Sequence, residues 1–127
     1  MTPLGIGIDV MDVARVQRLL HGKRDRVLER VLTEAERAYC LSQAEPARHV
    51  AVRLAAKEAA FKALHSGGAR VPIGWREVEV LRASHGEPSI AFHDRAERSA
   101  AELKVARIMV SLSHSDTHAV AVVLLLA

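Results

Sequence analysis

A carboxylate at the end of an expected strand is the first group in this chain that is placed for chemistry. In the segment Leu4–Val10, strand alternation puts Asp9 on one face with Gly5 and Gly7, while the opposite face is apolar. Because glycine has no side chain, we expect the Asp9 carboxylate to stand on a bare surface that is open to a ligand. An aspartate here can also cap the helix that follows, although Asp12 is better placed to do so.

A glutamate and a lysine one turn apart on an expected helix add a second carboxylate and a cation. Glu58 and Lys62 share a helical stripe with Ala51 and Ala55, and these small residues predict a hollow beside the charged groups. Two carboxylates suit a hard divalent cation such as Mg²⁺, and an ammonium group suits phosphoryl oxygens. Together with Asp9 they predict a site for a metal ion and a diphosphate. Taken alone, the Glu58–Lys62 spacing is also that of an ordinary surface salt bridge.

Two weaker features also indicate an anionic ligand. Arg53 and Lys57 form a like-charge pair one turn apart, which does not stabilise a helix and favours an anion nearby. His114 follows Ser113 where an expected strand turns, and such hydroxyl and imidazole groups could hold a phosphate. Serines also satisfy backbone groups at turns, and isolated histidines are commonly structural or solvated. The histidine spacing does not predict zinc, and Asp116 near His114 does not make a convincing nucleophilic triad.

Length and composition predict one soluble domain. The 127 residues, half of them hydrophobic, are enough for a real core, so we expect a single domain over residues 1–127. No apolar run approaches the roughly 18 to 20 residues of a membrane span, and the N-terminus does not resemble a signal peptide. The single cysteine, Cys40, cannot form an internal disulfide. These features predict a cytoplasmic protein that does not act at a membrane.

The net charge of +3 is unevenly distributed. The segment Arg15–Arg30 holds six basic and two acidic residues, a local charge of +4. A basic block of this kind attracts an acidic partner and speeds the encounter with it. Nucleic acid and an acidic protein both fit. The low aromatic content, 3%, and the absence of a recognised nucleic-acid motif weigh against nucleic acid.

The expected elements mix helices and strands without regular βαβ alternation. This predicts an α+β fold with a largely antiparallel sheet packed with a long central helix. The spacing Thr33–Glu36 matches a capping box, and Pro46 precedes the central helix. Helices are expected over residues 12–20, 26–31, 33–40, 47–64 and 94–105, and strands over residues 4–10, 77–82, 89–92, 108–113 and 118–126.

Taken together and in order, these motifs resemble the holo-acyl-carrier-protein synthases, the short single-domain branch of the 4′-phosphopantetheinyl transferases. The matching segments cover nearly the whole chain: GIGIDV at 5–10, Arg15, RVLERVLTEAE at 26–36, RLAAKEAAFKAL at 53–64, Gly86-Glu87-Pro88 and VSLSHS at 110–115. The resemblance implies a 4′-phosphopantetheinyl transferase-like fold. It also implies transfer of 4′-phosphopantetheine from coenzyme A to a serine of apo acyl carrier protein, which releases 3′,5′-ADP and supports fatty acid or polyketide biosynthesis.

The resemblance also assigns roles by position. Asp9 and Glu58 would hold Mg²⁺ against the coenzyme A pyrophosphate, and Lys62 would contact the same diphosphate. The other implied ligands of the coenzyme A phosphates, including its 3′-phosphate, are Arg53, Ser113 and His114. Arg15 and Arg26 match positions that receive the acidic helix of the carrier protein, so the expected macromolecular partner is this protein and not nucleic acid.

Members of the family resemble one another in forming homotrimers with the active site between subunits. The resemblance therefore implies a homotrimer here, with Val120, Val122 and Leu124 of the C-terminal strand as a candidate interface. The group that accepts the serine proton stays open between a carboxylate and a metal-held water. Asp116 is not assigned as this base, because an acidic residue would be expected directly after His114, where this chain has Ser115. Two alternatives also stay open. One is a nucleic-acid-binding module, and the other is a Mg²⁺-dependent enzyme that hydrolyses another nucleotide diphosphate.

Overall fold

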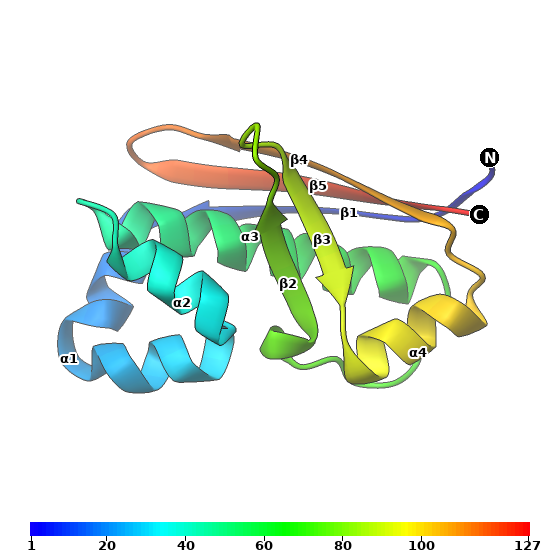
Figure 1. The fold of residues 1–127 in the computed structure, drawn as a ribbon, viewed down its shortest axis with the longest axis horizontal. Coiled ribbons are helices and arrows are strands. Elements are labelled where there is room, and N and C mark those ends of the chain that lie inside the picture. The colour runs from blue at the N-terminus through cyan, green and yellow to red at the C-terminus, as the bar shows by residue number, and fades with distance from the viewer.

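A three-stranded antiparallel sheet covers one side of a long central helix, and the remaining elements pack around that helix (Figure 1). The computed structural model describes all residues from 1 to 127. Its elements are β1 (Pro3–Asp12), α1 (Val13–Val31), α2 (Glu34–Leu41), α3 (Pro46–Ser66), a short 3₁₀ turn η1 (Trp75–Glu77), β2 (Val78–Arg82), β3 (Pro88–Phe92), α4 (Asp94–Glu102), β4 (Arg107–His114) and β5 (His118–Leu126).

The strands form two separate antiparallel sheets. In the larger one β5 lies between β1 and β4, so the last two strands form the expected hairpin and β1 pairs with the C-terminal strand. Strands β2 and β3 form a second hairpin of their own. The predicted α+β fold with a largely antiparallel sheet is confirmed. The sequence did not indicate that the strands divide into two sheets.

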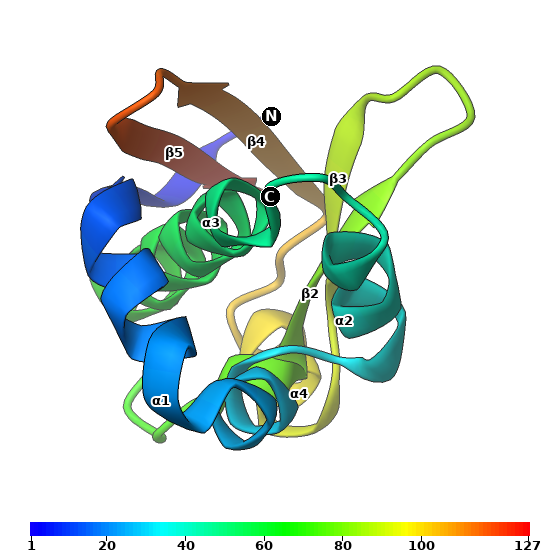
Figure 2. The ribbon, with the colours of Figure 1, turned by 90° about the vertical axis from the view of Figure 1, so that its left-hand side faces the viewer.

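Helix α3 is the centre of the core. Pro46 occupies its first turn, where the missing N–H has no helical partner, and Gly67 follows its last residue. Most of its alanines are fully buried, because the sheet, α1 and the β2–β3 hairpin surround it (Figure 2). An alanine surface lets neighbouring backbones approach closely.

The closest approach is between α3 and β1. A Cβ atom at Gly7 would lie 1.9 Å from the Ala59 carbonyl oxygen, and one at Gly5 would lie 2.1 Å from the Ala63 carbonyl oxygen. Only glycine allows this contact. The expected bare surface at Gly5 and Gly7 is therefore wrong, because the backbone of α3 fills the space beside the glycines. Their function is to bring the strand and the helix together.

The first helix is longer than expected. Asp12 caps it by accepting a hydrogen bond from the Ala14 N–H at 2.9 Å, as predicted. The predicted end at His21–Gly22 is wrong, because α1 continues to Val31 through a kink at Lys23 (φ −124°, ψ 45°). The segment after the kink is the short helix that the sequence indicated. The predicted capping box at Thr33 is confirmed, with the Glu36 carboxylate accepting from the Thr33 N–H at 2.8 Å.

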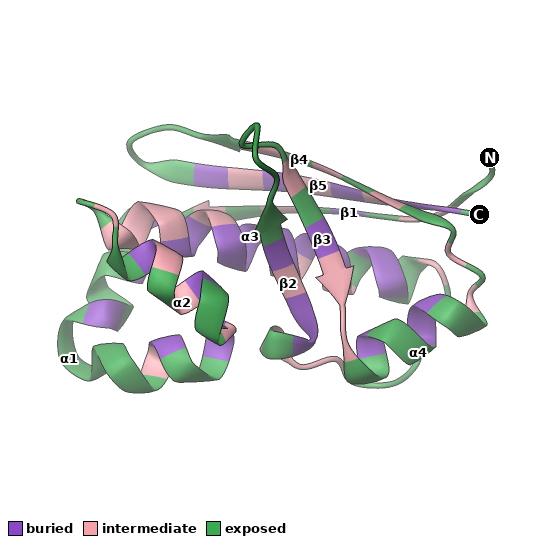
Figure 3. Cartoon of the chain, viewed as in Figure 1, coloured by how far each residue is buried: buried purple, intermediate pink, exposed green.

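The outer face of the larger sheet is apolar and uncovered. Ile6, Ile8 and Val10 are 61%, 60% and 59% exposed. Their cross-strand partners on β5 are Leu124, Val122 and Val120, respectively. Figure 3 shows buried and half-buried residues alternating along β5. Because successive residues of a strand point to opposite faces, the buried ones face α3 and the half-buried ones face outward. No helix of the structure is both long enough and apolar enough to span a membrane.

Candidate functional site

The three residues of the predicted metal and diphosphate site meet at the contact between β1 and α3. Lys62 donates hydrogen bonds to the Asp9 carboxylate at 3.1 Å and to the Ile8 carbonyl at 3.0 Å. Burial raises the pKa of Glu58, and the nearby negative charge of Asp9 raises it further, while Lys62 opposes both effects. The two carboxylates are therefore close enough to repel each other. We call Asp9, Glu58 and Lys62 the carboxylate site.

A cavity of about 470 Å³ opens beside the carboxylate site. Asp9 and Glu58 line one part of it, and Arg15 of α1 adds a cation at its edge. Most of the remaining wall is apolar and includes Leu54 and Trp75. The cavity therefore combines a charged end, suited to a diphosphate and a cation, with an apolar region for an uncharged part of the same ligand.

The donors of the carboxylate site fit Mg²⁺. No three acidic, histidine or cysteine side chains gather into a ligand cluster anywhere in the chain. Mg²⁺ is commonly bound by one or two carboxylates and completes its octahedral shell with waters and substrate phosphates. The repulsion between Asp9 and Glu58, which a divalent cation would relieve, supports this assignment.

The like-charge pair Arg53 and Lys57 has a different explanation from the one expected. Lys57 is fully buried, and its ammonium group donates to the Glu36 carboxylate at 2.7 Å and to the carbonyls of Trp75 and Val78 at 2.8 and 2.5 Å. The idea that Lys57 indicates an external anion is therefore wrong, because its anion is a residue of this chain. Burial lowers the pKa of Lys57, and the Glu36 charge counteracts that shift.

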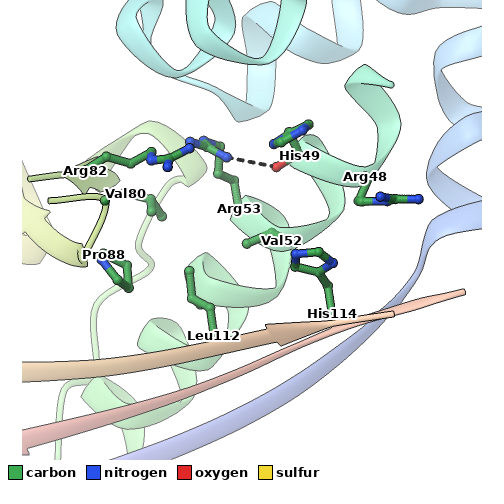
Figure 4. Close-up of a pocket in the computed structure, with 10 residues that line it drawn as sticks. Arg48, His49, Val52, Arg53, Val80, Arg82, Pro88, Leu112 and His114 are labelled. Carbon is green, nitrogen blue, oxygen red and sulfur yellow. Dashed lines mark hydrogen bonds between the residues drawn. The ribbon is translucent and has the colours of Figure 1, made fainter. Parts of the chain in front are cut away.

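A second cavity, of about 270 Å³, is lined by basic side chains and by no carboxylate (Figure 4). We call it the basic cavity. Its basic residues are Arg48, His49, Arg53, Arg82 and His114. Burial lowers the pKa of the His49 imidazole, and the positive charges of Arg53 and Arg48 lower it further. The turn between β2 and β3 also contributes to the wall, through Gly86 and Pro88.

The two cavities share no lining residue and lie on opposite flanks of α3. In Figure 2, α1 lies on one side of the central helix and the β2–β3 hairpin lies on the other. Strands β1 and β4, which contribute to the carboxylate site and the basic cavity respectively, are the two outer strands of their sheet. A single chain therefore does not bring Arg53 and His114 to Asp9 and Glu58.

The remaining predicted site residues occupy distinct positions. Ser113 is exposed and pairs with Val120 on the outer face of the sheet, so it does not line the basic cavity. Arg15 and Arg26 are both exposed on α1, and only Arg15 reaches the cavity of the carboxylate site. Asp116 is almost fully exposed and forms an ion pair with Arg48 at 3.2 Å.

Sequence analysis missed three residues of the basic cavity. Arg48, His49 and Arg82 belong to no motif, and Arg82 comes from β2, whose position against α3 depends on the tertiary fold. The Glu36–Lys57 ion pair was also missed, although one signal was available. A lysine among alanines on a central helix has no room to reach solvent, so it requires an internal carboxylate.

Comparison with known proteins identifies relatives over almost the whole chain. A family model described as the 4′-phosphopantetheinyl transferase superfamily matches residues 5–123. The holo-[acyl-carrier-protein] synthase of Moorella thermoacetica is 43% identical over 121 residues, which are 95% of this chain and 92% of that protein.

Solved structures give the same result. A holo-(acyl-carrier-protein) synthase from Bacillus anthracis in complex with coenzyme A is 30% identical, with a TM-score of 0.77 and coverage of 98% of this chain and 97% of that one. The holo-[acyl-carrier-protein] synthase of Neisseria meningitidis shares the fold, with a TM-score of 0.86, 23% identity and coverage of 99% and 100%. The resemblance expected from the sequence motifs is confirmed.

Proposed function

The chain belongs to the 4′-phosphopantetheinyl transferase superfamily, and from this premise we propose that it acts as a holo-[acyl-carrier-protein] synthase. It transfers 4′-phosphopantetheine from coenzyme A to a serine hydroxyl of apo acyl carrier protein and releases 3′,5′-ADP. The observation that carries the proposal is the convergence of Asp9, Glu58 and Lys62 beside a cavity that the two carboxylates line. We assign the reaction to fatty acid or polyketide biosynthesis in the cytoplasm.

The carboxylate site supplies positioning and charge neutralisation, which dominate catalysis of phosphoryl-type transfer. Asp9 and Glu58 would hold Mg²⁺, which when bound supplies positive charge to the diphosphate oxygens. Lys62 is held beside Asp9 and the Ile8 carbonyl, so its ammonium group would neutralise charge on a leaving phosphate bound there. The proton of the serine hydroxyl would pass to a carboxylate of the site or to a water that Mg²⁺ would supply when bound. Asp116 lies outside the cavity of the carboxylate site, in an exposed ion pair with Arg48, and we assign it no role in this step.

The first helix is the proposed docking surface for the acidic carrier protein. Arg15 and Arg26 are exposed on it and are free of ion pairs. Arg15 also lines the cavity of the carboxylate site, so a carrier bound over α1 would present its serine at that cavity. Charge complementarity of this kind mainly speeds association.

The coenzyme A phosphates require the basic cavity as well, and the two regions lie on opposite flanks of α3. We therefore propose a homotrimer in which the carboxylate site of one chain adjoins the basic cavity of the next, with Arg53, Ser113 and His114 along the coenzyme A phosphates. The exposed apolar face around Ile8 and Val122 supports such an assembly, because an uncovered apolar face of this kind marks an interaction surface.

Mass spectrometry of a carrier protein tests the proposed activity. The protein is incubated with coenzyme A, Mg²⁺ and an apo acyl carrier protein, with a chelator in the control reaction. We expect the carrier to gain the mass of one phosphopantetheine arm, and the chelator to abolish that gain. If several carriers show no mass gain, the proposal is wrong. Release of 3′,5′-ADP without any carrier would instead identify a hydrolase that uses the same site.

A further inference from the structure

A single aromatic ring brings together two arginines of the basic cavity. Tyr39 of α2 lies with its ring centroid 4.6 Å from the Arg53 guanidinium carbon and 4.8 Å from that of Arg82. The His49 ring packs edge-on against the same tyrosine, with 5.7 Å between ring centroids. Figure 4 shows the Arg53 and Arg82 side chains converging from α3 and β2 at one end of the basic cavity. Tyr39 thus links α2, α3 and β2.

Neither arginine has a carboxylate partner. Arg53 and Arg82 occur in none of the seven ion pairs of the structure. Arg53 is only 4% exposed, yet its buried Nε has no hydrogen-bond partner and its Nη1 donates only to the His49 carbonyl at 3.2 Å. Two like charges are therefore held close together without internal neutralisation, and this is unfavourable unless an anion binds.

The nearest acidic residues are committed elsewhere. A small cavity of about 130 Å³ on the Tyr39 side is lined by both arginines and by Glu36 and Glu79. Glu36 accepts from the Lys57 ammonium at 2.7 Å and from the Val80 N–H at 2.8 Å. Glu79 accepts from the Thr33 hydroxyl at 2.7 Å and contacts the His93 ring at 3.0 Å. These partners hold the carboxylates away from the guanidinium groups, which stay available to a ligand.

We infer that Tyr39 is a positioning residue that holds Arg53 and Arg82 ready for a phosphate monoester of the substrate. The face of an aromatic ring attracts cations, and a planar guanidinium stacks on it. This attraction offsets part of the repulsion between the two arginines. It also restricts the conformations of their side chains before the ligand arrives, which lowers the entropy cost of binding. Arginine forks then donate paired hydrogen bonds to phosphate oxygens. The inference rests on the proposed function, in which this phosphate is the 3′-phosphate of coenzyme A.

The test compares coenzyme A with 3′-dephospho-coenzyme A in the transfer assay. Tyr39→Leu keeps an apolar side chain and removes the ring, so we expect its KM for coenzyme A to rise by about tenfold while kcat stays within about twofold. Its KM for the dephosphorylated substrate should change by less than about twofold. Tyr39→Phe keeps the ring and should retain both values.

Phe92→Leu is the matched control, because Phe92 is a half-buried aromatic residue that lines neither the cavity of the carboxylate site nor the basic cavity. It should leave the ratio of the two KM values unchanged. If Tyr39→Leu raises both KM values equally, or neither, the inference is wrong. If Tyr39→Leu does not fold, as judged by circular dichroism, Arg82→Gln at an exposed position takes its place and must show the same selective rise in KM, or the inference fails.

Direct binding separates this inference from the proposed function. Calorimetry with 3′,5′-ADP and with 5′-AMP needs no transfer activity. We expect Tyr39→Leu to weaken binding of 3′,5′-ADP by about tenfold and to leave 5′-AMP binding unchanged. This result supports the role of Tyr39 even if no carrier is modified. Equal effects on the two nucleotides would overturn it even if transfer is observed.

Discussion

The carboxylate site and the basic cavity use the same central helix in different ways. The carboxylate site depends on backbone contact, since Gly7 lets β1 lie against α3 at Ala59 and this contact sets Asp9 beside Lys62. The basic cavity depends on long side chains from α3, β2 and β4 that an aromatic ring of α2 helps to gather.

This difference has a consequence for how each region tolerates change. A site fixed by backbone contact loses its geometry when one atom is added. A site made of several long cationic side chains instead loses part of its affinity with each side chain that is removed. The Glu36–Lys57 ion pair contacts one wall residue of each region. Lys57 bonds the carbonyl of Trp75, which lines the cavity of the carboxylate site, and Glu36 bonds the N–H of Val80, which lines the basic cavity.

The largest expected effect is on the carboxylate site. Glu58→Gln keeps the shape of the side chain and removes a metal ligand's charge, so transfer should fall by at least about a hundredfold. The pKa of Glu58 is higher in the folded chain than in the unfolded one. The stability that Glu58 contributes is therefore fully present below its unfolded-state pKa and is lost as pH rises through its folded-state pKa. At pH 7 the variant should therefore be at least as stable as the parent chain.

Enzyme assay and denaturant unfolding measure the two effects, with Glu97→Gln on the exposed face of α4 as the control. The control should change neither quantity. Near-normal turnover by Glu58→Gln would mean that the metal has been assigned to the wrong residues.

A smaller effect is expected when the backbone contact is broken. Gly7→Ala places a methyl group against the Ala59 carbonyl, which should cost about 3 kcal/mol of unfolding free energy and lower kcat by moving Asp9 away from Glu58. Gly22→Ala is the matched control, because a Cβ atom there meets nothing within 4 Å. It should stabilise α1 by about 0.5 to 1 kcal/mol and leave activity intact.

The same variant sharpens the contrast between the two regions. The basic cavity does not depend on the β1–α3 contact, so Gly7→Ala should lower the affinity for 3′,5′-ADP much less than it lowers transfer. Equal losses of binding and transfer would show that the regions are not built independently. Chemical denaturation and calorimetry provide the two measurements.

The carboxylate site could be predicted because its signals are local. Alternation places Asp9 opposite the apolar face of its strand, and helical spacing places Glu58 and Lys62 on one stripe, so each part is visible within a few residues. The role of the glycines was misjudged because a missing side chain predicts space but does not show what fills it. The chemistry of two carboxylates and an ammonium group suggested pairing the two segments, and the family resemblance supported that pairing.

The basic cavity could be predicted only in part. Arg53 and His114 came from motif positions, whereas Arg82 meets them only because the β2–β3 hairpin packs beside α3, a tertiary contact without a periodic signal. The exposure of Ile6 and Ile8 was also invisible, since alternation shows which residues share a face but not which face meets the core. The length of α1 was also not predicted, because His21–Gly22 indicates a helix end. In the structure a kink at Lys23 lets the helix continue past Gly22.

The smallest functional effect is expected at an ion pair outside both regions. Glu77 accepts hydrogen bonds from the Arg95 side chain at 2.7 Å and from the Gly74 N–H at 2.6 Å, and these lower its pKa to about 2. Glu77→Gln should cost about 1 to 3 kcal/mol of unfolding free energy at pH 7 and leave turnover within about twofold.

The sign of its pH dependence follows from the lowered pKa. The stability that Glu77 contributes is present above its ordinary pKa of 4.5 and is lost as pH falls toward about 2. The difference between the parent and Glu77→Gln should therefore shrink over that range in pH-dependent unfolding experiments. A constant difference would show that the variant acts through packing instead of charge.

Subunit mixing tests the central claim, that the carboxylate site of one chain works with the basic cavity of another. Glu58→Gln and the double variant Arg82→Ala/His114→Ala are co-expressed with different tags, and mixed trimers are purified through both tags in turn. Each mixed trimer contains one boundary at which both regions are intact, so we expect about one third of the parent activity from two variants that are each nearly inactive. Activity no higher than that of either variant alone would contradict the account.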